Sequence, residues 1–217
     1  MHSVHVDLQE SRERLFKHLS WEIRDARVVD AMKRVPRERF VPQELRDAAY
    51  EDHPLSIGFG QTISQPFIVA VMLQALELKE TDTVLEVGTG SGYVAAILGE
   101  LAAKVVSVEI VPELADSARA TVQALGYSNV HIHLVPKTTL GWIPDAPYDA
   151  IIVSAGAPSV PQLLLGQLRW NGRMVIPVGS RWQQNLVKIT RTPEGDVVDD
   201  LGGCFFVPLL GEGAWNG

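Results

Sequence analysis

The chain has 217 residues, of which 46% are hydrophobic and 21% are charged, and its formal net charge is −7. This composition is typical of a soluble globular protein that is long enough for a substantial core. The acidic balance, without a lysine- or arginine-rich stripe, argues against wholesale binding to nucleic-acid phosphate.

The cysteine count and the hydropathy of the chain further limit the classes of protein to which it can belong. The single cysteine, Cys204, can form no internal disulfide and offers no thiolate cluster for zinc, and we expect no other metal site. The first residues, "MHSVHVDLQESRERLF", are polar and lack the apolar core of a signal peptide, and no apolar run is long enough to span a bilayer. We therefore expect a cytoplasmic protein without a membrane partner.

Helical spacing of apolar residues marks the first part of the chain. These residues recur between positions 7 and 35, and Pro36 and Pro42 interrupt the pattern, which predicts short helices rather than one long rod. A polar stretch, "IGFGQTISQPFIVA", follows at positions 57–70. Its Pro66 suits the first turn of a helix that continues through "FIVAVMLQALEL".

Strand and helix patterns alternate from Val84 to Gly179. The runs "VLEV", "KVVSVEI", "NVHIHLV", "YDAIIVSA" and "RMVIPVG" are typical of buried strands, and helical patterns separate most of them, the last being "VPQLLLGQLRWNG". This alternation predicts a mainly parallel sheet with helices on both faces. "NLVKIT" and "CFFVPLL" flank the hairpin-like "TPEGDVV" without a helix between them, so they predict an antiparallel edge.

The segment "EVGTGSG" lies between the first of these strands and its helix. Its glycines allow the backbone to approach a ligand closely and leave free N–H groups at a helix amino terminus. The G-x-G-x-G spacing differs from the dinucleotide fingerprint G-x-G-x-x-G. Glu86 precedes the glycines, and Glu109 ends the next strand, where a carboxylate can accept hydrogen bonds from ribose hydroxyls. The alternative is a glycine-rich turn beside a solvent-exposed acid.

These features resemble the Rossmann-like fold of S-adenosylmethionine-dependent methyltransferases, whose first motif is acid-x-Gly-x-Gly-x-Gly. The expected fold is α/β, with extra N-terminal helices and an antiparallel C-terminal edge. We expect one domain over residues 1–217. It would comprise N-terminal helices and an active-site loop to about residue 80, the Rossmann-like core over 81–210, and a frayed tail over 211–217.

A longer set of segments is similar to one family, the protein-L-isoaspartate O-methyltransferases, from Leu15 to Leu209. "RVPRERFVP", "AYEDHPLSIGFGQTISQPFIVA", "VLEVGTGSGYVAAIL", "LGYSNV", "APYDAIIVSAGAPSVPQLL", "NGRMVIPVG" and "FFVPL" occur in the family's order, and "GQTISQP" is the most specific of them. The resemblance implies methyl esterification of the α-carboxylate of isoaspartyl residues in damaged proteins and peptides. It implies S-adenosylmethionine as cofactor, and we expect a monomer.

The resemblance also assigns site residues. It implies that Ser64 is catalytic, although a helix N-cap is the alternative role for this residue. The residues expected to hold cofactor are Thr62, Ile63, Glu86, Gly88, Thr89, Gly90, Ser91, Gly92, Glu109, Ile110 and Thr138. Those expected to contact substrate are Ile57, Gln61, Ser64, Ala155, Val207 and Pro208.

The chain departs from the family at one position of the expected cofactor site. The family usually carries Gly-Asp-Gly before its Gly-Trp, with the aspartate accepting from the adenine amino group, whereas this chain has Pro136-Lys137-Thr138. An ammonium cannot accept a hydrogen bond. Lys137 can therefore point to solvent, which we favour, or reach an adenine ring nitrogen, or pair with Glu109. In the first case a backbone carbonyl, or the hydroxyl of Thr138 or Thr139, would be the acceptor.

Other candidates and functions stay open at this level. His131 and His133 fall on one face of a strand and form either a metal-binding pair or a structural pair. Asp52 and His53 form either a proton-handling pair or a loop hydrogen bond. Cys204 is expected to pack as an apolar residue. The rival functions are a methyltransferase of the same fold with another acceptor, and an isoaspartyl-peptide-binding module with weakened turnover. A nicotinamide oxidoreductase is disfavoured by the glycine spacing.

Overall fold

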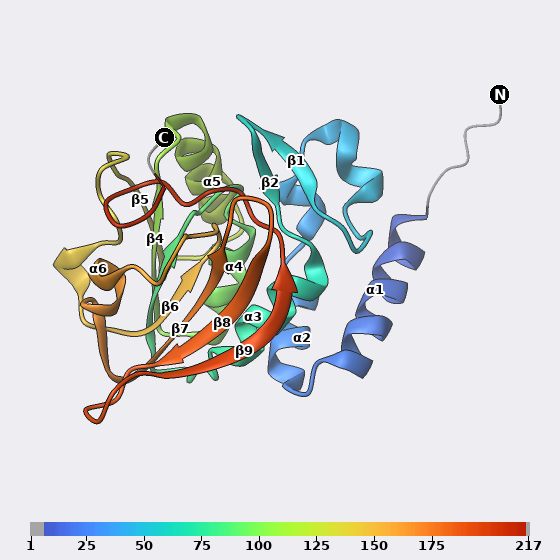
Figure 1. The fold of residues 1–217 in the computed structure, drawn as a ribbon. Coiled ribbons are helices and arrows are strands. Elements are labelled where there is room, and N and C mark those ends of the chain that lie inside the picture. Colours follow the sequence, from blue (N-terminus) through green and yellow to red (C-terminus); the bar gives the residue numbers. More distant parts are fainter. Residues whose placement is uncertain (1–6, 216–217) are drawn as a thin grey trace.

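The computed structural model describes residues 7–215, and its centre is a seven-stranded sheet in the order β5-β4-β3-β6-β7-β8-β9 (Figure 1). β3 pairs in parallel with β4 and β6, β5 and β7 extend the parallel part, and β8 and β9 form an antiparallel edge. The strands of this sheet are β3 (Thr83–Val87), β4 (Lys104–Glu109), β5 (Val130–Leu134), β6 (Tyr148–Val153), β7 (Leu168–Gly179), β8 (Gln184–Thr190) and β9 (Val197–Cys204). The α/β fold with an antiparallel C-terminal edge is as predicted.

Most helices cover one face of the sheet. Their apolar residues form one core cluster with the side chains of alternate strand positions such as Val84 and Val105. The other face is covered by one-turn α6 (Gln162–Leu165), the 3-10 turn η3 (Ile143–Asp145) and irregular segments, so the prediction of helices on both faces is only partly right. The helices of the first face are α1 (Leu8–Glu22), α2 (Ala26–Arg34), α3 (Pro66–Ala75), α4 (Tyr93–Leu101) and α5 (Pro112–Ala124).

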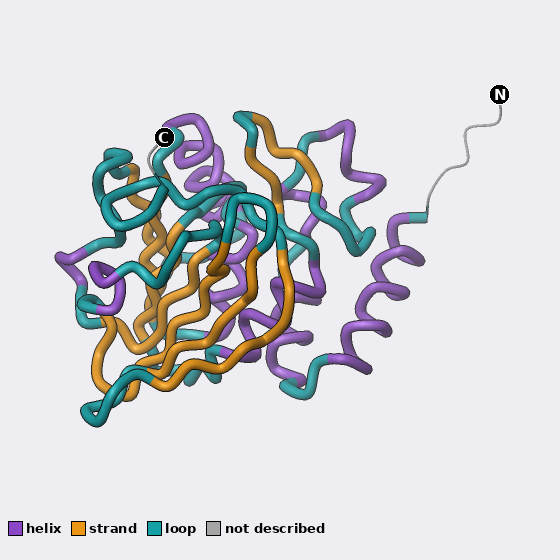
Figure 2. Tube along the Cα trace, in the orientation of Figure 1, coloured by secondary structure: helices purple, strands orange, loops and turns teal. Residues whose placement is uncertain are grey.

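The polar stretch at positions 57–70 forms a small hairpin before α3 enters the core. β1 (Leu55–Gly58) and β2 (Gln61–Ile63) pair antiparallel, and Gly58, Phe59 and Gly60 all have positive φ at the turn. Two 3-10 turns, η1 (Arg37–Phe40) and η2 (Gln43–Ala48), connect α2 to this hairpin. The strand arrows of Figure 1 and the same view in Figure 2 place the hairpin beside the carboxyl ends of the parallel strands.

Two expected C-terminal elements are wrong. The segment "LRWNG" belongs to β7 rather than to a helix, because α6 ends at Leu165 and the backbone N–H of Asn171 donates to the Arg191 carbonyl across the strand pair. "CFFVPLL" is not a strand, because β9 ends at the first residue of this segment, Cys204. Gln184, the first residue of β8, pairs with Cys204, so the antiparallel edge ends there, and Pro208 makes only an isolated parallel bridge with Gly156.

The predicted fraying of the tail is wrong for residues 211–215, while Asn216 and Gly217 lie outside the described residues. The Trp215 indole Nε1 donates to the Gly156 carbonyl at 3.0 Å, and its backbone N–H donates to Leu209 at 3.0 Å. A ring that packs and donates a hydrogen bond holds this end against the sheet.

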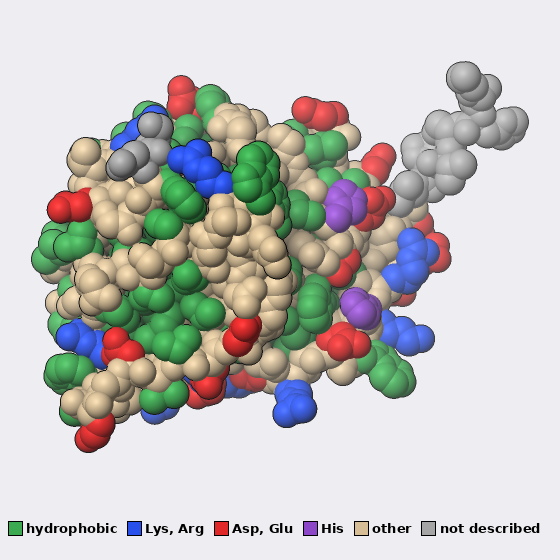
Figure 3. All heavy atoms as spheres, viewed as in Figure 1, with side chains coloured by type: hydrophobic (Ala, Val, Ile, Leu, Met, Phe, Trp, Pro, Cys, Tyr) green, Lys and Arg blue, Asp and Glu red, His purple; other side chains and the backbone are tan. Residues whose placement is uncertain are grey.

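The surface seen in Figure 3 carries charged side chains of both signs at scattered places, without a continuous basic patch on that face. Within residues 7–215, no helix combines the length and the apolar character needed to cross a bilayer.

Candidate active site

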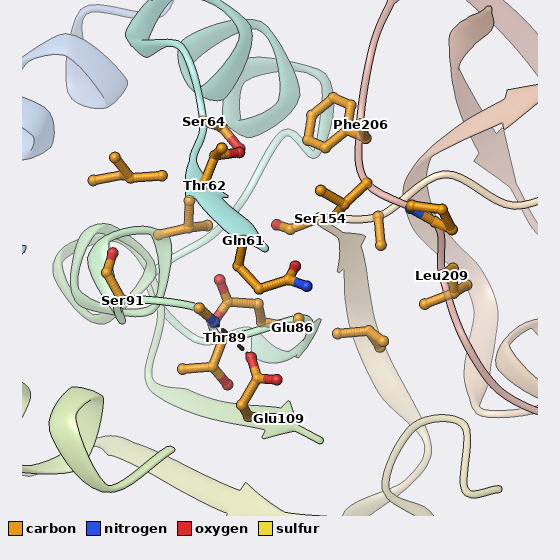
Figure 4. A pocket seen from close by; sticks show the side chains of 18 of the residues that line it. Gln61, Thr62, Ser64, Glu86, Thr89, Ser91, Glu109, Ser154, Phe206 and Leu209 are labelled. Atoms are coloured by element: carbon orange, nitrogen blue, oxygen red, sulfur yellow. Dashed lines mark hydrogen bonds between the residues drawn. The ribbon is translucent and has the colours of Figure 1, made fainter. Parts of the chain in front are cut away.

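A cavity of about 300 Å³ lies where β3, β4 and β6 end, between the β1–β2 hairpin and the segment that follows β9 (Figure 4). Parallel strands of this fold present their carboxyl ends to ligands at such an edge. Most residues predicted from the sequence line it together: Gln61, Thr62, Ile63, Ser64, Glu86, Gly88, Thr89, Gly90, Ser91, Glu109, Ile110, Ala155, Val207 and Pro208.

Three of the predicted residues lie outside the lining. Ile57 stands just behind it, since a Cβ added to Gly90 would meet the Ile57 side chain at 3.3 Å. Gly92 caps α4 with φ of +88°, and an added Cβ would meet Ala118 at 3.1 Å, so this position serves helix packing. Thr138 is exposed, and its neighbour Thr139 is in the cavity wall instead.

Sequence reasoning missed several wall residues. Tyr93 follows the glycine loop directly, and its burial gave it the pattern of an ordinary helix residue. Ser154 and Phe206 belong to the segments "VSAGAP" and "FVPL", which the family resemblance implies as lining of the peptide groove, but only the fold shows which of their side chains face the cavity (Figure 4).

Glu109 organises the glycine loop through its carboxylate. Oε2 accepts from the Gly90 N–H at 2.8 Å, and Oε1 accepts from the backbone N–H groups of Ile110 and Val111 at 2.8 and 3.0 Å. Because these bonds tie the end of β4 to the loop after β3, the loop and the acid form one rigid unit. The alternative of an unattached, exposed acid is excluded, since Glu109 is 7% exposed.

Glu86 is the more unusual acid of the pair. It is fully buried, its Oε2 accepts from the Ser107 hydroxyl, and its Oε1 has no hydrogen-bond partner within residues 7–215. Burial raises the pKa of Glu86 to about 8; the hydrogen bond from Ser107 opposes this rise, and the charge of Glu109 adds to it. A buried carboxyl with an unused acceptor atom beside a cavity is suited to a cationic ligand.

Ser64 has a side chain that is free to act in the cavity. The N-cap of α3 is Gln65, so the N-cap role for Ser64 is wrong; the Phe67 N–H instead donates to Asp52 Oδ1 at 2.8 Å. The Ser64 hydroxyl makes no hydrogen bond within the described part of the chain and lies in the cavity wall (Figure 4). Its backbone carbonyl accepts from Arg37 Nη2 at 2.7 Å.

Lys137 is exposed and forms no ion pair among the residues that the structure describes, so the pairing with Glu109 is not formed. It lies in a turn in which the Thr139 N–H donates to the Pro136 carbonyl at 2.9 Å. Thr139 and Leu140 reach the cavity from this turn. The geometry therefore agrees with the arrangement in which Lys137 points to solvent.

The remaining polar candidates have structural roles. His133 stacks on Trp142 with ring centres 4.0 Å apart, and residues 7–215 hold no group of three or more potential metal ligands. The His53 ring is bonded to Glu51 and to the Pro54 carbonyl at 2.6 and 2.9 Å, which confirms the loop hydrogen bond. Cys204 packs against the core, as expected.

The cavity suits a ligand with cationic groups, a ribose and an adenine. S-adenosylmethionine carries a sulfonium and an ammonium. The acid of Glu109 would neutralise part of this charge, and a nearby cation favours the ionised form of Glu86, whose Oε1 has no other partner among the described residues. Gly90 allows close backbone approach. Ile110 and Leu140 offer apolar contact for a ring. The fold and this site define an S-adenosylmethionine-dependent methyltransferase.

Comparison with known proteins identifies the family. Residues 10–214 match the family model of protein-L-isoaspartate(D-aspartate) O-methyltransferases, and the chain belongs to this family. It is 50% identical over 214 residues to protein-L-isoaspartate O-methyltransferase 1 of Syntrophobacter fumaroxidans, covering 98% of this chain and 100% of that protein. The predicted family, fold and cofactor class are thereby confirmed.

Two solved structures share the fold along most of the chain. A protein-L-isoaspartate O-methyltransferase superposes with a TM-score of 0.80 at 28% identity, covering 93% of this chain and 67% of that one. A β-aspartate methyltransferase of Plasmodium falciparum in complex with S-adenosyl-L-homocysteine gives a TM-score of 0.78 at 25% identity, covering 91% and 97%. Neither rival function of the sequence analysis is favoured by these relatives.

Proposed function

We propose that this protein transfers the methyl group of S-adenosylmethionine to the α-carboxylate of L-isoaspartyl residues in damaged proteins and peptides. The observation that carries the proposal is the juxtaposition of two unlike halves in one cavity. Glu86 and Glu109 make one half acidic, while the other half presents the unengaged hydroxyl of Ser64. Membership of the isoaspartate methyltransferase family supports the same function.

The chemistry requires little from the protein beyond positioning. A carboxyl acceptor with a pKa of about 3–4 is ionised at neutral pH, so no general base is needed. The bound cofactor supplies an electrophilic methyl group on a sulfonium. The protein must hold the anion in line with that methyl group and exclude water, so catalysis depends mainly on the orientation of the two reactants. The Ser64 hydroxyl can donate to one carboxylate oxygen without adding a charge.

Substrate contacts other than Ser64 follow from the cavity wall. Gln61 enters from the hairpin, and Ala155, Val207 and Pro208 enter from the opposite side. We assign these residues to the peptide that carries the acceptor, and we assign Glu86, Glu109 and the glycine loop to the cofactor. Thr139 replaces Thr138 in the cofactor assignment because only the former lines the cavity.

The partners are isoaspartyl-containing proteins and peptides. We propose a monomer that acts in the cytoplasm without nucleic-acid or membrane partners. The net charge of −7 supports the exclusion of nucleic acid, as does the scatter of lysine and arginine on the face in Figure 3.

Radiolabelled methyl transfer tests the function. A synthetic peptide with one isoaspartyl residue should be methylated, and the same peptide with an ordinary aspartyl residue should not. A chain that labels both peptides equally, or neither of them, would contradict the proposed acceptor. Circular dichroism of the same sample shows whether an inactive preparation is folded.

A further inference from the structure

Arg37 is a buried cation that lies behind Ser64 and has no part in the methyl transfer described above. Arg37 is 0% exposed; its Nε donates to the Ala49 carbonyl at 2.8 Å and its Nη2 to the Ser64 carbonyl at 2.7 Å. Its Nη1 is buried without a hydrogen-bond partner in the described part of the chain. No carboxylate within residues 7–215 lies at ion-pair distance from this guanidinium.

Among the carboxylates, Asp52 influences Arg37 most, after the Tyr93 phenol, and it is already engaged in other hydrogen bonds. Asp52 attracts the guanidinium, yet its two oxygens accept from the Phe67 N–H and from the Gln65 amide. Burial lowers the pKa of Arg37, but a guanidinium stays protonated near neutral pH. Arg37 is therefore a buried positive charge without a full counter-charge, an arrangement that proteins rarely keep without a function.

Tyr93 adds a second unsatisfied group at the same place. Its ring centre lies 4.8 Å from Arg37 Cζ, and the residue is 1% exposed while forming part of the cavity wall. Its hydroxyl has no hydrogen-bond partner among the described residues. Tyr93 and Arg37 attract each other, and a hydroxyl that accepts from a guanidinium still has its own proton to donate. This buried pair therefore keeps a net positive charge and a donor at the Ser64 side of the cavity, where Tyr93 belongs to the wall.

The two halves of the cavity lie next to charges of opposite sign, and each sign is complementary to one reactant. Glu86 and Glu109 lie on the glycine-loop side, where a cationic cofactor would sit. Arg37 lies on the Ser64 side, where the acceptor anion would sit. This polarity favours each reactant in its own half and disfavours the exchange of the two.

We propose that Arg37 and Tyr93 form the anion-binding floor of the acceptor site. Arg37 is a positioning residue. Only Ser64 separates its guanidinium from the place of the acceptor carboxylate, and the positive charge of Arg37 attracts that carboxylate. The Tyr93 hydroxyl donates a hydrogen bond to the carboxylate or orients it. This inference rests on the proposed function and deepens it, since it names the group that selects an ionised acceptor.

Paired ligands separate this role from a purely structural one. The probes are an isoaspartyl peptide with a free α-carboxylate and the same peptide with an α-carboxamide. Dissociation constants are measured by calorimetry on protein saturated with S-adenosylhomocysteine, so that no turnover occurs. The readout is the ratio of the carboxamide constant to the carboxylate constant, because a general loss of structure changes both constants and leaves their ratio unchanged.

Arg37→Met should lower this ratio by about tenfold or more, since it removes the balancing charge and leaves the carboxamide contacts. Arg37→Lys, which keeps the charge, should retain a larger ratio than Arg37→Met. The matched control is Arg39→Met, which removes an exposed arginine from the same η1 turn and should leave the ratio unchanged. A folded Arg37→Met protein with the wild-type ratio would overturn the proposal.

Tyr93→Phe provides the deciding arm if Arg37→Met does not fold. It removes a hydroxyl that attracts the Arg37 guanidinium but forms no hydrogen bond within the described residues, so the midpoint of thermal unfolding should change little. Binding of the carboxylate peptide should nevertheless weaken by about threefold to tenfold, as for one lost hydrogen bond. Unchanged affinity for the carboxylate peptide would refute the proposed anion-binding role of Arg37 and Tyr93. Failure of the wild type to methylate any isoaspartyl peptide would instead refute the proposed function.

Discussion

Replacing Glu86 by glutamine should change how the stability of the cofactor-free protein depends on pH. Glu86 is fully buried, and its pKa rises from the usual 4.5 to about 8. Between these two values the folded protein holds a proton that the unfolded chain has lost. Stability therefore falls as the pH rises through this window, because the folded state binds more protons.

The magnitude follows from the two pKa values. At 1.36 kcal/mol for each pH unit, the rise from 4.5 to about 8 corresponds to about 5 kcal/mol of lost stability above pH 8, as an upper limit. A neutral amide has no such loss, but its NH₂ group would be buried where Oε1 has no partner, at a cost of about 1–3 kcal/mol.

The two effects predict a crossing of the stability curves. Near pH 4.5, Glu86→Gln should be about 1–3 kcal/mol less stable than the wild type, since only the amide cost remains. Above pH 8 it should be about 2–4 kcal/mol more stable. Urea unfolding of both proteins at intervals from pH 4.5 to 9 measures the difference, and Glu44→Gln, at an exposed glutamate, is the matched control.

Parallel curves for wild type and Glu86→Gln would refute the reasoning, because they would show that Glu86 does not titrate in the folded protein within this window. Calorimetric titration with S-adenosylmethionine complements the unfolding data. The variant should bind the cofactor more weakly even where it is the more stable protein, since an uncharged amide cannot neutralise a cationic ligand.

Three further predictions concern the cavity. Gly90→Val should abolish cofactor binding in calorimetry while circular dichroism stays native, because φ is +53° and an added Cβ meets Ile57 at 3.3 Å; unchanged affinity would mean that the site is misplaced. Ser64→Ala should lower turnover on isoaspartyl peptide far more than cofactor affinity, with little change in thermal stability because this hydroxyl makes no cap; unaltered turnover would exclude the catalytic role. Lys137→Asp should tighten S-adenosylmethionine binding by up to about tenfold, as expected for one restored acceptor near Thr139. A severalfold weaker dissociation constant would show that Lys137 is itself a cofactor contact.

The sequence by itself determined the cofactor half of the site. Gly88, Gly90 and Glu109 are positioned by a strand, a turn and the end of the next strand, and each of these is a local pattern. Parallel strand order then brings consecutive strand ends to one edge of the sheet. Local periodicity and backbone freedom were therefore sufficient to predict where Glu86 and Glu109 meet.

Tertiary structure alone decided what surrounds Ser64. The sequence left Ser64 with two roles. Asp52, fifteen residues before Phe67, accepts from the Phe67 N–H, and the N-cap position falls on Gln65, so the N-cap role of Ser64 is removed. Likewise, nothing local in "RVPRERFVP" shows that Arg37 is the arginine buried behind Ser64 while Arg39 stays exposed. Which buried group finds a partner depends on side chains that meet only after the chain has folded, and a pattern of neighbouring residues does not contain that information.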